Sequence, residues 1–196
     1  MQALEKHHYS PEEYLALEET AEYKSEYYRG ELFAMVGASV NHNQIVSNLH
    51  ASLHLHLKHK PCRVFMSDLR LWMQEANLYT YPDLLVVCGT LAFAPGRNDT
   101  ITNPMLIIEV LSESTQAYDR GRKFEFYRTL PTLKEYLLID QYRFYVEQFS
   151  KNSENKWVFS EYTPSQKKLI LSSLDFQLSF QDLYDKVENL PGLSVH

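Results

Sequence analysis

The segment 105–111, Met-Leu-Ile-Ile-Glu-Val-Leu, places one acidic residue, Glu109, inside an almost continuous apolar run. The segment 81–88, Tyr-Pro-Asp-Leu-Leu-Val-Val-Cys, has the same character, and Asp83 stands at the start of its apolar part. Runs this apolar are typical of central strands that are covered on both faces. We therefore predict a sheet with both segments near its centre.

Helices are expected on either side of these strands. Ser10 before Pro11 and two glutamates predicts a helix start, and this helix should run to about Glu19. Asn41 is expected to cap a longer helix, whose apolar residues recur every four positions, at Ile45, Leu49, Leu53 and Leu57. Further helices are predicted at 118–129, ended by Pro131, and from Ser179, where Asp182 completes a capping box.

More strands are predicted outside the two central segments. They are two short strands in 26–36 around Arg29-Gly30, a run at 62–73, a hairpin of 135–140 with 142–150, and a strand at 157–162. No internal repeat or linker is apparent. The sequence thus predicts a single α/β domain over residues 1–196, with a mixed central sheet flanked by helices.

The composition narrows the class of protein. The 196 residues are 44% hydrophobic, enough for one buried core, and the net charge is -6. This charge argues against a protein that binds nucleic acid mainly by neutralising phosphates, although carboxylates that hold a cation also make a protein acidic. No apolar run approaches the ~20 residues of a membrane span, and the first residues lack the apolar core of a signal peptide. A soluble cytoplasmic protein without a membrane partner is expected.

Cysteine and histidine give weaker signals. Cys62 and Cys88 each lie in a strand-like apolar run, so we expect buried, reduced thiols and assign neither a disulfide nor a metal to them. His50 and His54 are one helical turn apart, a spacing that zinc sites use. No cysteine or acid with suitable spacing joins them, and a polar helix face explains them adequately.

Asp83 and Glu109 are the candidate functional residues, because an ionised carboxylate among apolar residues is costly unless it is paired or holds a metal. If their strands lie side by side, two carboxylates and a main-chain carbonyl surround one point. This is the oxygen environment that Mg²⁺ or Mn²⁺ prefers. Lys123, in the helix that follows the Glu109 strand, can reach toward the acids and stabilise charge on a phosphate.

A family resemblance rests on four runs in a fixed order: YPDLLVV (81–87), IIEVLSEST (107–115), DRGRKFEFY (119–127) and EYLLID (135–140). Over roughly residues 10–185 the chain resembles the Uma2-like (DUF820) endonuclease family, which is abundant in cyanobacteria and belongs to the PD-(D/E)xK superfamily. The resemblance implies a restriction-endonuclease-like fold. It also implies a metal-dependent endonuclease that hydrolyses phosphodiester bonds of nucleic acid, with DNA the expected substrate.

The resemblance also implies roles for particular residues. Asp83 matches the aspartate of the PD motif and Glu109 the acid of the second motif, both of them metal ligands in the superfamily. The parent pattern would place a lysine at Leu111, whereas the family's lysine lies on the following helix and matches Lys123. Further matches are Glu31, an acid before the long helix in YYRGELFAMVGAS, and His42 in ASVNHNQI. The fold implies a homodimer, since two sites related by a two-fold axis match the two strands of a duplex.

Each assignment has a simpler structural alternative. Asp83 could simply cap a turn after Pro82, and Glu109 could form a structural salt bridge with Arg70 or Arg122. Lys123 could form an i,i+4 surface pair with Asp119. Tyr127 could pack in the core and make no contact with substrate. At the level of function, the alternatives are a catalytically silent nucleic-acid-binding or scaffold protein that retains the nuclease fold, and a hydrolase for another phosphate-containing substrate.

Overall fold

The computed structural model describes residues 7–35 and 37–191 of the chain. Its α-helices are α1 (Pro11–Glu18), α2 (Val40–Leu57), α3 (Gln116–Tyr118), α4 (Phe124–Tyr127) and α5 (Phe180–Leu183), with a π-helical turn η1 (Asp119–Lys123) and a 3-10 turn η2 (Pro164–Gln166). Its strands are β1 (Ser25–Tyr28), β2 (Glu31–Ala34), β3 (Cys62–Met66), β4 (Arg70–Met73), β5 (Leu78–Thr80), β6 (Leu84–Cys88), β7 (Thr100–Ile101), β8 (Leu106–Leu111), β9 (Glu135–Asp140), β10 (Val146–Lys151), β11 (Trp157–Tyr162), β12 (Lys168–Leu171) and β13 (Phe176–Ser179).

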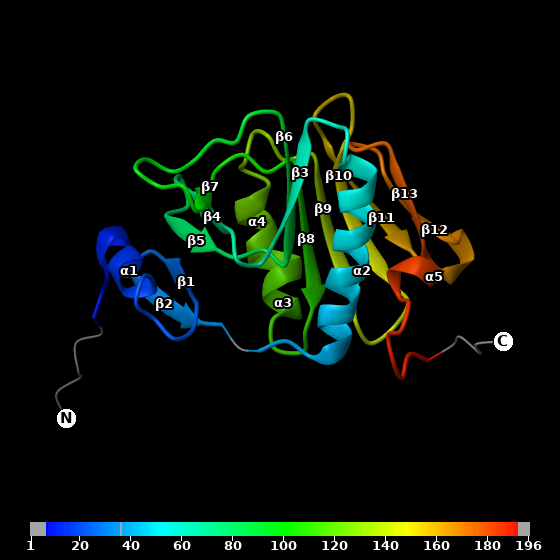
Figure 1. Ribbon diagram of the computed structural model, residues 1–196, viewed down its shortest axis with the longest axis horizontal. Helices are drawn as coiled ribbons and strands as arrows, with labels where there is room; N and C mark the ends of the chain where they lie inside the picture. The colour runs from blue at the N-terminus through cyan, green and yellow to red at the C-terminus, as the bar shows by residue number, and fades with distance from the viewer. Residues whose placement is uncertain (1–6, 36, 192–196) are drawn as a thin grey trace.

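A six-stranded sheet of order β11-β10-β9-β8-β6-β3 forms the centre of the molecule (Figure 1). β8 lies between β6, to which it is antiparallel, and β9, to which it is parallel. Every residue of β8 and β9 is buried. The predicted mixed central sheet, flanked by helices and with the two apolar segments in its interior, is therefore confirmed.

Two hydrophobic cores lie on opposite faces of this sheet, because neighbouring residues of a strand point to opposite sides. Leu84 and Val86 pack on the face that α2 covers, whereas Leu85 and Val87 pack with Tyr127 on the other (Figure 1). Beside this second core lie the α3–α4 segment and a five-stranded sheet of order β2-β1-β5-β4-β7. Side chains that reach across the second core can therefore join the two sheets.

Helix α2 follows the predicted apolar stripe but begins two residues earlier than expected. Its stripe of Ile45, Leu49, Leu53 and Leu57 is buried, as predicted. The N-cap is Ser39, whose Oγ accepts the main-chain N–H of His42 at 3.1 Å. The prediction of Asn41 as the cap was wrong, since its amide instead donates to the carbonyl of Glu188 at 2.9 Å.

Several other boundaries were shifted or missed. The run 62–73 is two strands in different sheets, β3 and β4, with a turn between them in which Leu69 N–H donates to the Met66 carbonyl at 3.1 Å. The helix predicted at 118–129 is interrupted by the π-helical turn η1, and β10 begins at Val146 instead of at 142. The strands β5, β7, β12 and β13 were not predicted. Each has only two to four residues, too few for a period of two to appear.

Other local predictions were confirmed. Ser10 caps α1 in a capping box with Glu13, and β1 and β2 form the hairpin around Arg29-Gly30. β9 and β10 pair antiparallel, and Ser179 accepts the N–H of Asp182 at the start of α5. In the described residues no helix is both long and apolar enough to cross a membrane.

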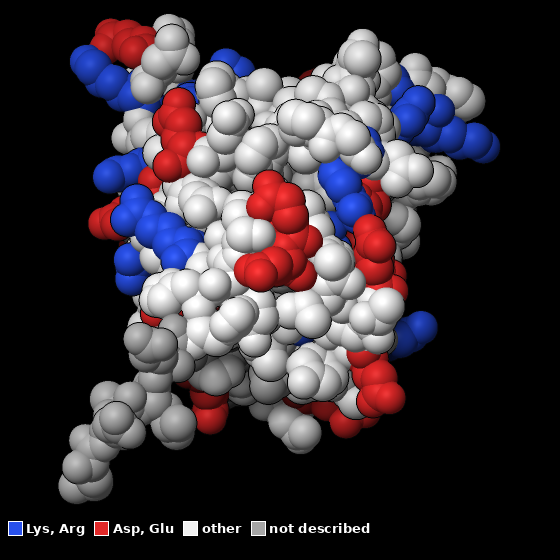
Figure 2. Space-filling model, turned by 90° about the vertical axis from the view of Figure 1, so that its left-hand side faces the viewer, with Lys and Arg blue, Asp and Glu red and all other residues white. Residues whose placement is uncertain are grey.

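The surface on the α1, β1 and β2 side of the molecule carries both signs of charge. Figure 2 shows an acidic group near the middle of this face, with basic side chains on either side of it. This face therefore presents neither a continuous basic track nor a uniformly acidic surface.

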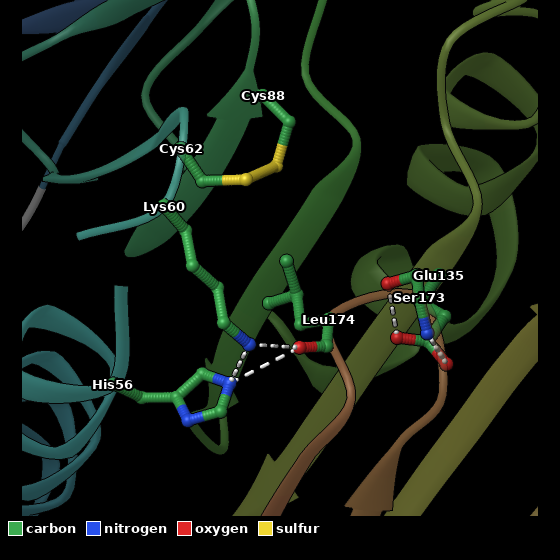
Figure 3. The surroundings of a disulfide bond; sticks show 7 residues. All are labelled: His56, Lys60, Cys62, Cys88, Glu135, Ser173 and Leu174. Carbon is green, nitrogen blue, oxygen red and sulfur yellow. Dashed lines mark hydrogen bonds between the residues drawn. A yellow bond between two sulfur atoms is a disulfide. The ribbon is translucent and has the colours of Figure 1, made fainter. Parts of the chain in front are cut away.

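Cys62 and Cys88 form a disulfide, so the prediction of two reduced thiols was wrong. The two residues are directly opposite each other in the antiparallel pair β3–β6, with Cα atoms 3.9 Å apart. This register, invisible in the sequence, brings the sulfur atoms together. The bond lies where α2 ends and β3 begins, beside Lys60, whose ammonium donates to the carbonyl of Leu174 at 3.2 Å (Figure 3).

We expect this disulfide to contribute to stability, because it closes a chain loop with a sequence separation of 26 and so restricts the unfolded chain. The double variant Cys62→Ser/Cys88→Ser should lower the free energy of unfolding by about 2–4 kcal/mol in urea denaturation. Dithiothreitol should destabilise the wild-type chain by a similar amount and leave the variant unchanged. Equal urea midpoints for the variant and the oxidised wild type would contradict the expectation.

Candidate functional site

Asp83 and Glu109 lie side by side in the central sheet. β6 pairs antiparallel with β8, with Leu84 opposite Ile108, so the residue before β6 comes next to Glu109. The N–H of Asp83 donates to Glu109 Oε2 at 3.3 Å, and the N–H of Val110 donates to Asp83 Oδ2 at 2.7 Å. The predicted proximity of the two carboxylates is therefore present. The bond from Val110 also shows that Asp83 does more than cap a turn.

Lys123 reaches the acids from the π-helical turn η1. Its Nζ lies 3.0 Å from Glu109 Oε1 and 3.4 Å from Asp119 Oδ1. All three side chains are buried. The contact with Asp119 is thus part of a buried cluster and is not the ordinary surface pair considered from the sequence. Burial in a π-helical turn is consistent with a functional position, since such turns are frequent at functional sites.

The cation beside Glu109 is Lys123 and neither of the two arginines proposed as structural partners. Arg70 donates to the hydroxyl of Tyr81 at 2.8 Å and has its carboxylate neighbours in Glu18 and Asp99. Arg122 donates to the hydroxyl of Tyr28 at 3.1 Å. Glu109 is therefore held by the helix that follows its own strand.

Tyr127 belongs to the core and also to the site. Its ring is fully buried, in accordance with the core alternative, and its hydroxyl donates to Glu109 Oε1 at 2.7 Å. Together with Lys123 and the N–H of Asp83, this gives Glu109 three donors. Such a set fixes the orientation of a carboxylate before any ligand arrives.

His42 contacts Asp83 from the first turn of α2. Its Nε2 lies 3.0 Å from Asp83 Oδ2, and its Nδ1 is buried without a hydrogen-bond partner among the described residues. The position of this imidazole follows from the cap at Ser39, which fixes the first turn of the helix. The residue that the family resemblance selected is thus next to the candidate metal ligand.

The hairpin β1–β2 contributes an acid that was not predicted. Glu26 Oε1 lies 3.5 Å from Lys123 Nζ and also accepts a hydrogen bond from Thr80 Oγ1. Glu31, the predicted acid, begins β2, directly opposite Tyr28 in the hairpin. The contact with Lys123 comes from Glu26. Period-two alternation places Glu26 and Tyr28 on one face of β1, but nothing in the sequence points this face toward Lys123.

Asp119 also belongs to this cluster, although from the sequence it was considered only as a surface salt-bridge partner of Lys123. Its side chain is buried, and its Oδ1 has no hydrogen-bond partner within the described part of the chain. Its position four residues before Lys123 was visible in the sequence. Its burial was not, because that depends on η1 packing against the sheet.

Three carboxyl groups, those of Glu26, Glu109 and Asp119, thus lie around one ammonium group, and Asp83 lies beside Glu109. Burial raises the pKa of Glu109; the ammonium of Lys123 opposes this effect, and Asp83 and Asp119 add to it. Burial alone would lower the pKa of Lys123, but Glu109, Tyr127, Glu26 and Asp119 together outweigh this effect and raise it well above its usual value. Lys123 is therefore a cation at neutral pH and does not serve as a general base.

Solvent reaches this cluster on the Asp83 side. The side chain of Asp83 is 18% exposed and that of Glu109 only 3%. Asp83 Oδ2 is occupied by Val110 and His42, while its Oδ1 has no hydrogen bond to any other described residue. Of these two acids, Asp83 is therefore the more accessible to a ligand from solvent.

The chain has extensive similarity to known proteins. Residues 11–181 match the Uma2 family model, which is described as "Putative restriction endonuclease". The chain belongs to the Uma2 family. The matched range includes the four sequence runs and every candidate site residue, so the predicted family membership is confirmed.

Two relatives of this Uma2 chain come from the cyanobacterium Synechocystis sp. (strain ATCC 27184 / PCC 6803 / Kazusa). The uncharacterized protein sll1609 is 44% identical over 149 residues, which cover 76% of this chain and 84% of the relative. The uncharacterized protein slr1290 is 37% identical over 177 residues, covering 89% of this chain and 90% of the relative.

The Uma2 chain also resembles a solved structure, described as that of "a putative nuclease belonging to DUF820" from Anabaena variabilis ATCC 29413. The TM-score is 0.71 at 20% sequence identity, and the similarity covers 88% of this chain and 96% of that one. This similarity confirms the predicted α/β fold class.

Proposed function

We propose that the chain is a metal-dependent endonuclease that hydrolyses phosphodiester bonds of nucleic acid. The observation that carries the proposal is the contact of 3.0 Å between Lys123 Nζ and Glu109 Oε1, next to Asp83. The parent motif would have its lysine at position 111, whereas this chain has Leu111 and a lysine on the following helix. The structure nevertheless brings this residue, Lys123, into contact with the acid Glu109. The description of the family as restriction endonucleases and the nuclease likeness of the Anabaena structure support the same activity.

The residues present fit a divalent cation of the Mg²⁺ or Mn²⁺ class. The cluster has an excess of buried carboxyl groups over cationic groups, since Glu109 and Asp119 are both buried and share the single ammonium group of Lys123. Such an excess is unfavourable without a further positive charge. Asp83 and Glu109 would hold the ion through carboxylate oxygens, the ligands that these cations prefer. In residues 7–35 and 37–191, no group of three or more His, Cys, Asp or Glu side chains is arranged as a metal site.

We therefore propose three metal ligands: the carboxylates of Asp83 and Glu109 and the main-chain carbonyl expected from the sequence. When bound, the cation would supply charge stabilisation to a phosphodiester under attack. Within the described residues, no third His, Cys, Asp or Glu side chain joins His50 and His54 in a possible metal site.

The chain's own residues have distinct roles in this proposal. Lys123 stabilises negative charge on the phosphate, because it keeps its proton at neutral pH. Tyr127 holds Glu109 in place through its hydroxyl. His42 is a positioning residue, since its contact is with Asp83 Oδ2. Glu26 and Asp119 orient the ammonium of Lys123 from two other sides.

A catalytically silent nucleic-acid-binding or scaffold protein is the second candidate. The net charge of -6 favours it, as do the interspersed acidic and basic side chains on the face in Figure 2. It differs from the first candidate in one measurable property, the cleavage of nucleic acid. A homodimer, DNA as the substrate, a role for Glu31 and a cytoplasmic location stay predictions.

The proposal is tested by Mn²⁺ titration calorimetry together with plasmid cleavage, on the wild type and on Asp83→Ala. We expect the wild type to bind Mn²⁺ and cleave, and the variant to lose the binding heat and at least about 100-fold in cleavage rate. Asp68→Ala is the matched control, because the side chain of Asp68 is 91% exposed and pairs with Lys24. Mn²⁺ binding without cleavage by the wild type would favour the silent protein, and equal binding by wild type and Asp83→Ala would remove the metal site.

A further inference from the structure

Two arginine side chains pack against Tyr28, next to the candidate site. The guanidinium carbon of Arg122 lies 4.9 Å from the centre of the Tyr28 ring, and that of Arg29 lies 5.3 Å from it. Arg122 also donates to the Tyr28 hydroxyl at 3.1 Å. Phe126 packs against the same ring, with centroids 5.1 Å apart. Two positive charges are thus held against one aromatic ring by cation–π contacts and a hydrogen bond.

Arg29 occupies a backbone position that disfavours arginine. It is the first of the two loop residues of the β1–β2 hairpin, with φ of 48°, and Gly30 follows with φ of 93°. Two positive φ values define a type I′ turn, where asparagine, aspartate or glycine is preferred at the first position. The unfavourable turn position of Arg29 is offset by its contact with the Tyr28 ring, and a broken local preference of this kind is a reason to test the residue for a function.

Both guanidinium groups are accessible from solvent. Both arginines are exposed, and the contacts that the structure gives them are with the aromatic side chains of Tyr28 and Phe126. Four other arginines have carboxylate partners: Arg70, Arg97, Arg120 and Arg143. Because they are exposed and pack on aromatic rings, Arg29 and Arg122 can be reached by an anion from outside.

The two arginines are adjacent to the candidate active site. Glu26 and Tyr28 are alternate residues of β1 and so share a face, while Lys123 and Arg122 are consecutive residues of η1. Glu26 contacts Lys123, and Tyr28 contacts Arg122. The two contacts are separated by about 7 Å along β1, because a strand rises about 3.3 Å per residue.

We propose that Arg29 and Arg122, oriented by Tyr28, bind a backbone phosphate of the nucleic-acid strand that Lys123 and the two acids act on. The proposal rests on the proposed nuclease function and adds a substrate-binding subsite to it. Guanidinium groups match phosphate oxygens in charge and geometry. An acidic protein needs such a local positive group, since its overall charge repels nucleic acid.

The test uses Arg122→Ala and Arg29→Asn, with Arg63→Ala as the control. Arg63 is an exposed residue of β3, an edge strand of the six-stranded sheet, whereas the hairpin β1–β2 belongs to the five-stranded sheet. The probe is a fluorescently labelled DNA duplex, its dissociation constant is measured by anisotropy over a range of salt concentrations, and cleavage kinetics are followed with Mn²⁺.

Each test variant is expected to weaken binding about tenfold and to reduce the slope of log K against log salt by about 1, with KM raised and kcat little changed. Arg29→Asn should lose affinity while its thermal midpoint stays at or above that of the wild type, because asparagine suits the turn better. Arg63→Ala should bind like the wild type.

The two proposals fail in different ways. A wild type that cleaves DNA, with both test variants matching Arg63→Ala in affinity, KM and salt slope, would overturn the phosphate subsite and leave the nuclease function intact. A wild type that neither binds nor cleaves DNA would overturn both.

Discussion

Replacing Lys123 with methionine should abolish cleavage and also destabilise the fold. The side chain is buried among Glu109, Asp119 and Glu26, so its removal leaves acids without their cation. Breaking a buried ion pair from one side typically destabilises a protein by about 3–5 kcal/mol. We expect a loss of this size in urea denaturation and a fall in cleavage rate of at least about 100-fold.

The double variant Glu109→Gln/Lys123→Met separates the structural role of the lysine from its role in the reaction. It removes both charges of the closest pair, and neutral replacement of a buried pair is often tolerated. Most of the lost stability should therefore return, while cleavage stays absent. Lys58→Met, at an exposed position after α2, is the matched control and should behave like the wild type. A Lys123→Met protein with wild-type stability and cleavage would contradict both roles.

Leu53→Ala should strongly destabilise the protein. Leu53 is fully buried on the face of the helix that packs on the central sheet. Truncating such a leucine leaves a cavity and lowers the free energy of unfolding by about 2–5 kcal/mol. The measurement is urea denaturation followed by circular dichroism.

The same substitution two residues later is its control. Leu55 lies on the same helix but is 74% exposed, so Leu55→Ala should change the stability by no more than about 0.5 kcal/mol. Similar losses for the two variants would mean that α2 does not pack on the sheet through the face that contains Leu53.

The local features of this chain could be predicted because their causes are local. Hydroxyl caps, the four-residue stripe of α2 and the apolar runs of β6 and β8 each depend on residues a few positions apart. Asp83 and Glu109 could be selected for the same reason, since each is a charged residue beside or within an apolar strand. Their family roles, and those of Lys123 and His42, came from the order and spacing of motifs.

The rest of the site could not be predicted because it depends on contacts between distant segments. Glu26 and Lys123 meet only because the hairpin β1–β2 packs against η1, and Asp119 is buried only because η1 faces the sheet. The disulfide shows the same limit. Cys62 and Cys88 look like two ordinary strand cysteines until the register of β3 with β6 places them opposite each other.

The sequence by itself determined the class of fold, the family and the pair of acids at the centre of the sheet. Only the tertiary structure decided which side chains complete the cluster around Lys123, which cysteines pair, and that Arg29 and Arg122 meet at Tyr28. Periodicity, capping and turn preference act over a few residues and are therefore written in the sequence. Strand register and the packing of one sheet against another are set by the whole chain at once, through burial and steric fit.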